Sequence, residues 1–289
     1  LDRVTVDYVF KNSTDKDVVD AIVAFPMPDI TGTLYDRPQI PDDQSDNFLG
    51  FEVTVDGKAV KPELDQRASA LGIDITDLLK ANGVPVNPFS PPVFAALEKL
   101  PEATAQDWIN RGLLFIDEYD DGSGWKNVRT PMWSLKSTYW WKSSFPAGKE
   151  VKVSHRYKPS VGATSGLTFF YDNHFDNDSG TYDQYKRDYC LDSGFEKAVL
   201  KAAKESKEGY PMLMEERLDY VLTTANTWAG PIGEFKLTLD KGNAKNVISL
   251  CIDGIKKTGP TTFVSEKKNF TPKDDLSILL VPDSSTLPQ

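Results

Sequence analysis

Apolar and polar positions alternate along most of the chain, with the period of a half-buried β-strand. In the first half this pattern predicts strands at residues 5–10, 18–25, 48–55, 58–60, 132–145 and 151–157. In the second half it predicts strands at residues 213–224, 234–239, 247–252, 261–266 and 276–281. The short spacing of the first two strands predicts a hairpin. We therefore expect a mainly β protein of antiparallel β-sandwich architecture, with one or two sandwich units.

Two segments depart from the alternating pattern. From about residue 62 to residue 112, Asp74, Ser90 and Thr104 stand where helix N-caps are expected, which predicts a small helical insertion. A further helix is predicted at residues 193–206, where apolar residues recur at spacings of three and four. We interpret residues 117–124 (DEYDDGSG) as an acidic loop.

The 289 residues suit one large domain or two smaller ones. We predict an N-terminal β-sandwich unit at residues 1–162, which contains the helical insertion, and a C-terminal β-rich unit at residues 163–289. The two could also form one composite domain. The sequence begins directly in a strand pattern, without an initiator Met or an apolar targeting segment, so we expect a processed or trimmed chain.

Charge and hydrophobicity exclude several classes of protein. Asp and Glu number 43 against 33 Lys and Arg, so the formal net charge is −10. A chain this acidic repels phosphate backbones, and we predict no nucleic-acid partner. No apolar run approaches the ~18 residues of a membrane helix, so we predict that the protein does not span a membrane.

Cys190 and Cys251 are the two cysteines of the sequence. Two buried thiols would be usual in a cytoplasmic protein. The strands on both sides and the acidic, loop-rich surface favour a disulfide instead, and that bond would require an oxidising compartment.

Asp172, Asp176 and Asp178 lie in a segment that is also rich in Asn and Gly. Carboxylate and amide oxygens suit Ca²⁺, so these three residues form a possible metal site. An EF-hand loop that starts at Asp176 would need Glu at its twelfth position, where Arg187 stands. The alternative is a solvated turn without metal, and we predict no other cofactor.

Catalytic residues are not indicated. His155 lies in a predicted strand, where we expect it to be packed or hydrogen-bonded at a sheet face, and His174 is expected to be a surface cation. Pairs of carboxylates could serve a hydrolase, but 43 acidic residues make pairs common by chance. We therefore predict no catalytic residue.

Two tryptophans are candidate ligand-binding residues. In the strand at residues 132–145 one face is expected in the core, and it carries Trp133, Leu135, Ser137, Tyr139 and Trp141. Trp140 lies on the opposite, mostly polar face, where it could stack on a sugar ring, anchor a partner, or be covered by the helical insertion. Trp228 is followed closely by glycines and a proline, which is typical of a residue that fixes a chain corner.

Sequence blocks spread over nearly the whole chain carry a resemblance. They are YVFKN at 8–12, VAFPMPDI at 23–30, FPAG at 145–148, HRYKPSVG at 155–162, TWAGPIG at 227–233 with Phe235, DKG at 240–242, and KKTGPTTF at 256–263. The chain resembles an exported bacterial family known as domain of unknown function 4424. The resemblance implies a secretion signal in the precursor, a periplasmic location and pairing of Cys190 with Cys251. It implies no activity or substrate.

We therefore expect a periplasmic or secreted protein, a non-enzymatic binding or interaction module of the bacterial cell envelope. Its expected partner is an envelope protein or a saccharide. One alternative is a carboxylate-dependent hydrolase that acts on envelope polysaccharide, and another is a structural subunit of a periplasmic assembly.

Overall fold

The computed structural model describes residues 3–32, 39–164, 166–171, 174–176, 179–205 and 213–283. Contacts within the chain divide it into two units. One is Asp2–Ser160, and the other is Val161–Gln289 together with Leu1. Both are built mainly from antiparallel sheets, so the predicted fold class is confirmed. Among the described residues, no helix is long and apolar enough to cross a membrane.

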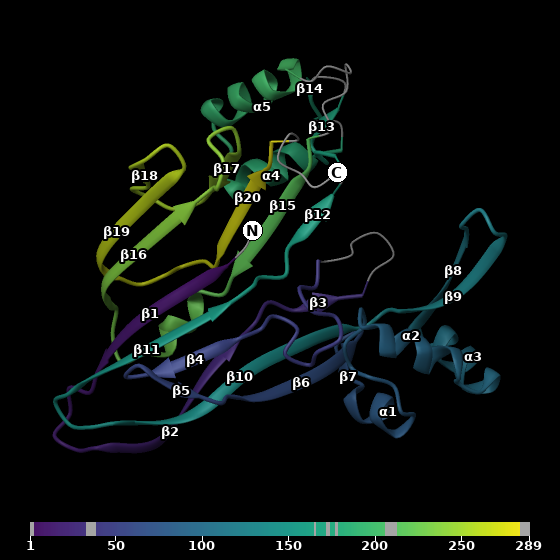
Figure 1. Cartoon of the computed structure of the whole chain (residues 1–289), viewed down its shortest axis with the longest axis horizontal. Helices are drawn as coiled ribbons and strands as arrows, with labels where there is room; N and C mark the ends of the chain where they lie inside the picture. Colours follow the sequence, from purple (N-terminus) through teal and green to yellow (C-terminus); the bar gives the residue numbers. More distant parts are fainter. Residues whose placement is uncertain are drawn as a thin grey trace. The chain divides into compact units, whose positions relative to one another are not determined.

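The N-terminal unit is a sandwich of two sheets (Figure 1). The first has the order β1 (Val4–Lys11), β11 (Glu150–Tyr157), β4 (Glu52–Val55) and β5 (Lys58–Val60). The second has the order β2 (Val18–Pro26), β10 (Ser134–Phe145), β6 (Glu63–Ala70) and β7 (Ile73–Asp74), and β3 (Ile30–Thr31) also pairs with β10. The predicted hairpin of the first two strands is wrong, because β1 pairs with β11 and β2 with β10. The chain crosses between layers here, so each strand turns its apolar face to a shared core.

Aromatic rings from the two sheets meet in that core. The ring centroids of Phe25 and His155 are 4.1 Å apart, and those of Phe51 and Tyr139 are 4.3 Å apart. The expected alternation along β10 is confirmed, since Trp133, Leu135, Ser137, Tyr139 and Trp141 are all buried. The pleat of the strand thus places the face that we expected on the inside.

The helical segment begins later than expected. Its helices are α1 (Thr76–Ala81), α2 (Pro91–Glu98) and α3 (Glu102–Asn110). Residues 63–70, which we had included in the insertion from residue 62, form β6 instead. The inward residues of β6 include Ala68 and Ala70, whose small side chains do not give a clear strand pattern. The helices pack on these alanines and on Trp133.

The expected acidic loop at residues 117–124 is also wrong. Its first residues belong to β8 (Leu114–Asp120), which pairs with β9 (Trp125–Pro131) in a separate two-stranded sheet. Figure 1 shows this hairpin extending beyond α2 and α3. Acidic residues are uncommon in strands, and here the partner strand rather than local propensity decides the conformation.

The main sheet of the C-terminal unit has the order β12 (Gly162–Thr164), β15 (Glu215–Tyr220), β20 (Leu276–Val281) and β17 (Val247–Leu250). The helices α4 (Thr181–Tyr189) and α5 (Ser193–Glu205) pack against it (Figure 1). We expected α5 but not α4. The buried residues of α4 are Tyr182, Tyr185 and Tyr189, and tyrosine spacing within a polar segment is a weak indication of a helix.

The described part of this unit also has two smaller sheets. One has the order β16 (Ile232–Asp240), β19 (Thr262–Phe270) and β18 (Lys256–Lys257), and in the other β13 (Phe170–Tyr171) pairs with β14 (His174–Phe175). The predicted disulfide is confirmed. Cys190 follows α4, Cys251 follows β17, and their Cα atoms lie 5.0 Å apart. The bond ties the helical layer to the main sheet.

Candidate functional site

A short helical turn in the C-terminal unit is anchored by a carboxylate from a distant loop. The 3₁₀ helix η1 (Thr223–Thr227) follows β15, and Asp275 precedes β20. Asp275 Oδ1 accepts hydrogen bonds from the backbone N–H of Leu222 (2.9 Å), the backbone N–H of Thr223 (2.9 Å) and the hydroxyl of Thr223 (2.7 Å). Asp275 thus satisfies N–H groups that the start of a helix leaves without partners.

The protonation of Asp275 is tied to this arrangement. Burial raises the pKa of Asp275, but the hydrogen bonds from Thr223 and Leu222 favour the charged form and together outweigh burial. The pKa is therefore below its ordinary value, and the anchor is a carboxylate at neutral pH.

The far end of η1 is tied to the same loop. Asn226 Nδ2 donates to the carbonyl of Pro272 over 2.9 Å. Trp228 follows in an extended conformation, with its backbone N–H donating to the carbonyl of Ala225. The backbone around Trp228 is thus held by η1, whose residue Asn226 is in turn bonded to the loop between β19 and β20.

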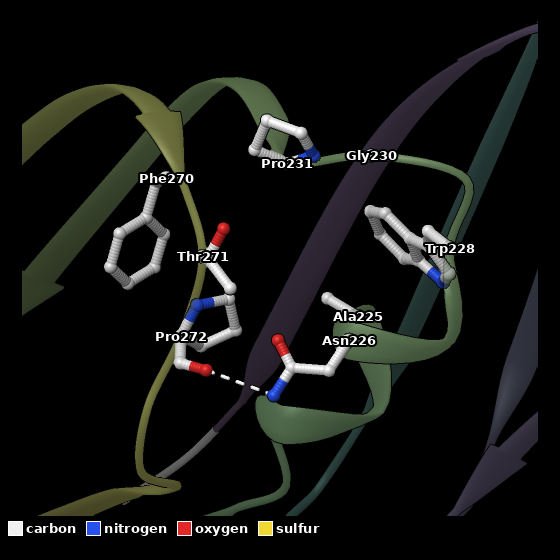
Figure 2. Close-up of a pocket in the computed structure, with 8 residues that line it drawn as sticks. All are labelled: Ala225, Asn226, Trp228, Gly230, Pro231, Phe270, Thr271 and Pro272. Atoms are coloured by element: carbon white, nitrogen blue, oxygen red, sulfur yellow. Dashed lines mark hydrogen bonds between the residues drawn. The ribbon is translucent and has the colours of Figure 1, made fainter.

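Between the turn and the loop lies an open pocket of about 320 Å³. It is lined by Ala225, Asn226, Trp228, Gly230, Pro231, Phe270, Thr271 and Pro272. Figure 2 shows Trp228 across the pocket from residues 270–272, with Pro231 on a further side. Trp228 is 37% exposed as a residue, so it is partly covered by the protein and partly in contact with solvent. Aromatic and proline rings with a few polar groups are typical of a ligand pocket.

Phe270, which lines the pocket, also contacts the side chains of Phe235 and Lys267. Its ring centroid lies 4.7 Å from that of Phe235, and Lys267 Nζ lies 4.8 Å from its centroid. The ring is thus held by an aromatic neighbour and a cation, which gives this wall of the pocket a defined position.

The two tryptophans predicted from the sequence lie in different environments. Trp140 is half-buried on the outer face of its sheet, between the cross-strand positions Ala24 and Glu63. The helical cluster contains Trp133, seven positions before Trp140 and on the opposite face of the strand, and Trp140 is not among the residues of that cluster. Trp228 lines the pocket. The structure thus brings Trp228, and not Trp140, into a candidate site.

The possible calcium site lies mostly outside the described residues. Asp172 and Asp178 are not among them. Asp176 is half-buried, its backbone N–H donates to the carbonyl of Phe169, and its Oδ2 accepts from Ser179 over 3.4 Å. Within the described segments, no group of three or more His, Cys, Asp or Glu side chains is arranged to hold a metal ion. Calcium binding stays a prediction.

His155 is packed rather than hydrogen-bonded. It is 1% exposed, and neither ring nitrogen has a hydrogen-bond partner among the described residues. Aromatic rings surround it, including those of Tyr8, Phe51 and Tyr157. Burial lowers the pKa of His155 to about 4, and the charge of Asp7 opposes this effect only in part. A neutral imidazole enclosed by apolar rings has no access to a substrate.

Glu215 is the one buried carboxylate in the part of the chain that the structure describes. Its Oε1 accepts from the hydroxyls of Tyr185 (2.6 Å) and Thr168 (3.2 Å), and Arg217 Nε lies 3.7 Å away. Burial and then the bond to Glu215 raise the pKa of Tyr185 to about 12. The cluster joins α4 to β15, and its hydroxyl groups satisfy the hydrogen-bonding capacity of the carboxylate. Glu215 is therefore a structural residue and not one member of a catalytic pair of carboxylates.

The partners of Trp228 in the pocket were not found from the sequence. Phe270, Thr271 and Pro272 lie more than 40 positions along the chain, and Asp275 looks like one more acidic loop residue. A pattern of local spacing does not report such contacts. The glycines and proline after Trp228 indicated a chain corner, but they did not indicate which residues lie opposite Trp228 across the pocket.

Comparison with known proteins identifies the family. Residues 1–279 match the family described as Domain of unknown function (DUF4424), and the chain belongs to it. No curated protein matches the sequence.

One solved structure is similar at a low level. It is a protein of Legionella pneumophila subsp. pneumophila str. Philadelphia 1, described as a candidate nutrient binding protein, with 16% identity and a TM-score of 0.42. The match covers 96% of this chain and 59% of that protein, so the chain spans less than two thirds of its length.

Proposed function

We propose that the protein is an exported, non-enzymatic binding module of the bacterial cell envelope that holds its ligand against Trp228. The observation that carries this proposal is the open pocket between η1 and the loop before β20, in which a large aromatic ring is positioned yet partly exposed. Burying an aromatic ring in a fold is favourable, so an indole held at a pocket surface is available to a ligand.

The chemistry of the lining suggests the class of ligand. Trp228, Pro231 and Pro272 offer ring faces, while Asn226 and Thr271 offer an amide and a hydroxyl. A ligand with one apolar face and polar edges suits this combination, as a sugar ring does. We therefore infer an envelope saccharide.

The disulfide supports the proposed location. Cys190 and Cys251 are joined, and bonds of this kind form and persist mainly in oxidising compartments such as the bacterial periplasm. The periplasm is thus the compartment that the covalent structure favours.

A thermal-shift screen of cell-wall sugars tests the proposal, with divalent ions and small metabolites as comparison sets. A ligand that prefers the native state raises the melting temperature, and at 100 times its Kd it stabilises by about 2.7 kcal/mol. Trp228→Ala should abolish the shift, and Trp228→Phe should retain part of it.

Trp125→Ala is the matched control, because Trp125 is 77% exposed and lies in the other unit. This variant should respond as the unaltered protein does. If no saccharide shifts the melting temperature, or if Trp228→Ala leaves a shift intact, the proposed site is wrong.

A further inference from the structure

The hairpin of β8 and β9 exposes aromatic side chains that a sandwich would ordinarily bury. Trp125 is 77% exposed, Tyr119 is 45% exposed and Phe115 is 43% exposed. An isolated two-stranded hairpin is marginally stable in water. Contact of these aromatic rings with water is unfavourable, and a partner molecule that covers them would remove this unfavourable solvation.

The base of the hairpin is held by the helical segment. Arg129 of β9 donates from Nη1 to the carbonyls of Leu97 (2.8 Å) and Leu100 (3.1 Å), and its Nη2 lies 2.6 Å from a carboxylate oxygen of Glu102. The tip is ordered by Asp120, whose Oδ1 accepts from the backbone N–H groups of Gly122 and Gly124. The hairpin is therefore anchored at one end and shaped at the other.

One long edge of this hairpin is open. In the described part of the chain β8 pairs only with β9, so its other edge presents backbone N–H and C=O groups that can accept a further strand. Strand addition to such an edge is a general mode of peptide recognition.

The two faces of β8 differ in chemistry. Pairing places Phe115 opposite Thr130 and Tyr119 opposite Lys126, so these two rings share one face. Asp117 lies between these rings on the same face, whereas Glu118 and Asp120 lie on the other face with Trp125, which pairs with Asp120, because side chains alternate along a strand. The added strand that fits has apolar side chains on the first face and cationic side chains on the second.

Charge also decides what kind of chain occupies this edge. Residues 117–126 hold four carboxylates and one lysine, and the whole protein has a formal charge of −10. A second copy would place Glu118 and Asp120 beside like charges, which is unfavourable in a strand pair. We propose that β8 docks an extended segment of a partner protein in which lysine or arginine alternates with apolar residues.

A synthetic peptide in which lysine alternates with valine is the probe. Binding is measured by calorimetry at low and at physiological salt, and hydrogen exchange of the amides of residues 115–120 reports the site. We expect saturable binding and slower exchange in β8. Because surface charge pairs are weak, Glu118→Gln together with Asp120→Asn should reduce the affinity about five-fold at low salt.

Two controls separate strand addition from attraction between opposite charges. The same peptide with N-methyl groups on alternate residues keeps its charge but cannot pair along the strand, and it should not bind. Asp42→Asn together with Asp43→Asn changes the protein's charge equally at exposed residues outside the hairpin, and should leave the affinity unchanged. Equal binding of the methylated peptide, or unchanged exchange in β8, would overturn the proposal.

Two further readouts decide the outcome. Concentration-dependent self-association in sedimentation, strengthened when Glu118→Gln and Asp120→Asn remove like charges, would replace the basic partner by a second copy. Tyr119→Ser should weaken binding of the peptide while the nuclear magnetic resonance spectrum of the rest of the protein stays unchanged. Failure of these tests leaves the Trp228 pocket unaffected, because that pocket lies in the other unit.

Discussion

Among the described residues, each unit buries one side chain of the Asp, Glu, Lys, Arg and His types, and the two units accommodate it in opposite ways. In the N-terminal sandwich His155 lies among aromatic rings without a hydrogen-bond partner in the described residues, and burial keeps it neutral. In the C-terminal unit Glu215 is fully buried but accepts from Tyr185 and Thr168, with Arg217 beside it. The rings packed on His155 give its nitrogens no hydrogen bond, whereas Glu215 receives donors from Tyr185 on α4 and from Thr168 before β13.

The largest expected effect concerns the disulfide, which the N-terminal unit lacks. Cys190→Ser with Cys251→Ser opens a loop closed over a sequence separation of 61 residues, which in the chain-entropy model lowers the free energy of unfolding by about 4 kcal/mol. Denaturant titration followed by hydrogen exchange measures each unit separately. The loss should fall on residues 161–283, and an equal loss in both units would show that the bond stabilises the whole chain.

The next effect tests whether Glu215 depends on its donors. Glu215→Ala removes the acceptor of the Tyr185 and Thr168 hydroxyls and the carboxylate beside Arg217, and it should lower the free energy of unfolding by about 3 kcal/mol. Glu215→Gln retains an acceptor and should cost less. Glu234→Ala removes an exposed carboxylate and is the control, expected to change stability by under about 0.5 kcal/mol. Equal costs for the two Glu215 variants would contradict the account of the cluster.

Acid should weaken the N-terminal sandwich through His155. The folded pKa is about 4 and the ordinary value is 6.5, so between these values the unfolded chain binds a proton that the folded chain does not. This contribution to stability is therefore complete above pH 6.5 and falls as the pH falls, by about 2 kcal/mol at pH 5. Urea titrations above pH 6.5 and at pH 5 measure this difference in the free energy of unfolding. In His155→Phe this part of the pH dependence should disappear, and its persistence would assign the effect to other groups.

The smallest effect concerns the anchor of the pocket. Asp275→Ala removes the cap of η1 and should destabilise this turn by about 1 kcal/mol, with faster hydrogen exchange at residues 222–228. Because hydrogen bonds lower the pKa of Asp275, its contribution is present above the ordinary pKa of Asp and is lost as the pH falls through the folded value. Asp274→Ala, at the adjacent exposed position, is the control. Equal rates of hydrogen exchange at residues 222–228 in the two variants would show that Asp275 does not anchor η1.

Much of the N-terminal sandwich was predictable because its strands follow local rules. In β10 the inward residues Leu135, Ser137, Tyr139 and Trp141 were assigned correctly from alternation alone, whereas the buried Ser143 was not assigned. Asp56 and Gly57 form the tight turn that joins β4 to β5, and Gly57 supplies a φ of 76° that suits such a turn. By contrast, the pairing of β1 and β2 with distant strands depends on which apolar faces meet, and spacing along the chain pointed to the wrong partner.

The candidate site was predictable only in part. Trp228 was singled out, but the residues that make a pocket with it come from another strand and loop. Of the exposed aromatic residues of the β8 and β9 hairpin, Tyr119 lies in the segment 117–124 that we interpreted as a loop. Phe115 and Trp125 lie just outside that segment, at positions for which no strand was predicted.

The order of residues by itself determined the β class, the apolar faces of individual strands, the acidic surface and the presence of two cysteines able to pair. Tertiary structure alone decided which strands are neighbours, how Glu215 and His155 are accommodated, and what surrounds Trp228. The physical reason is that periodicity and turn preference act between residues close in sequence. Pairing, burial and pockets arise from residues that are far apart along the chain and meet only when it folds.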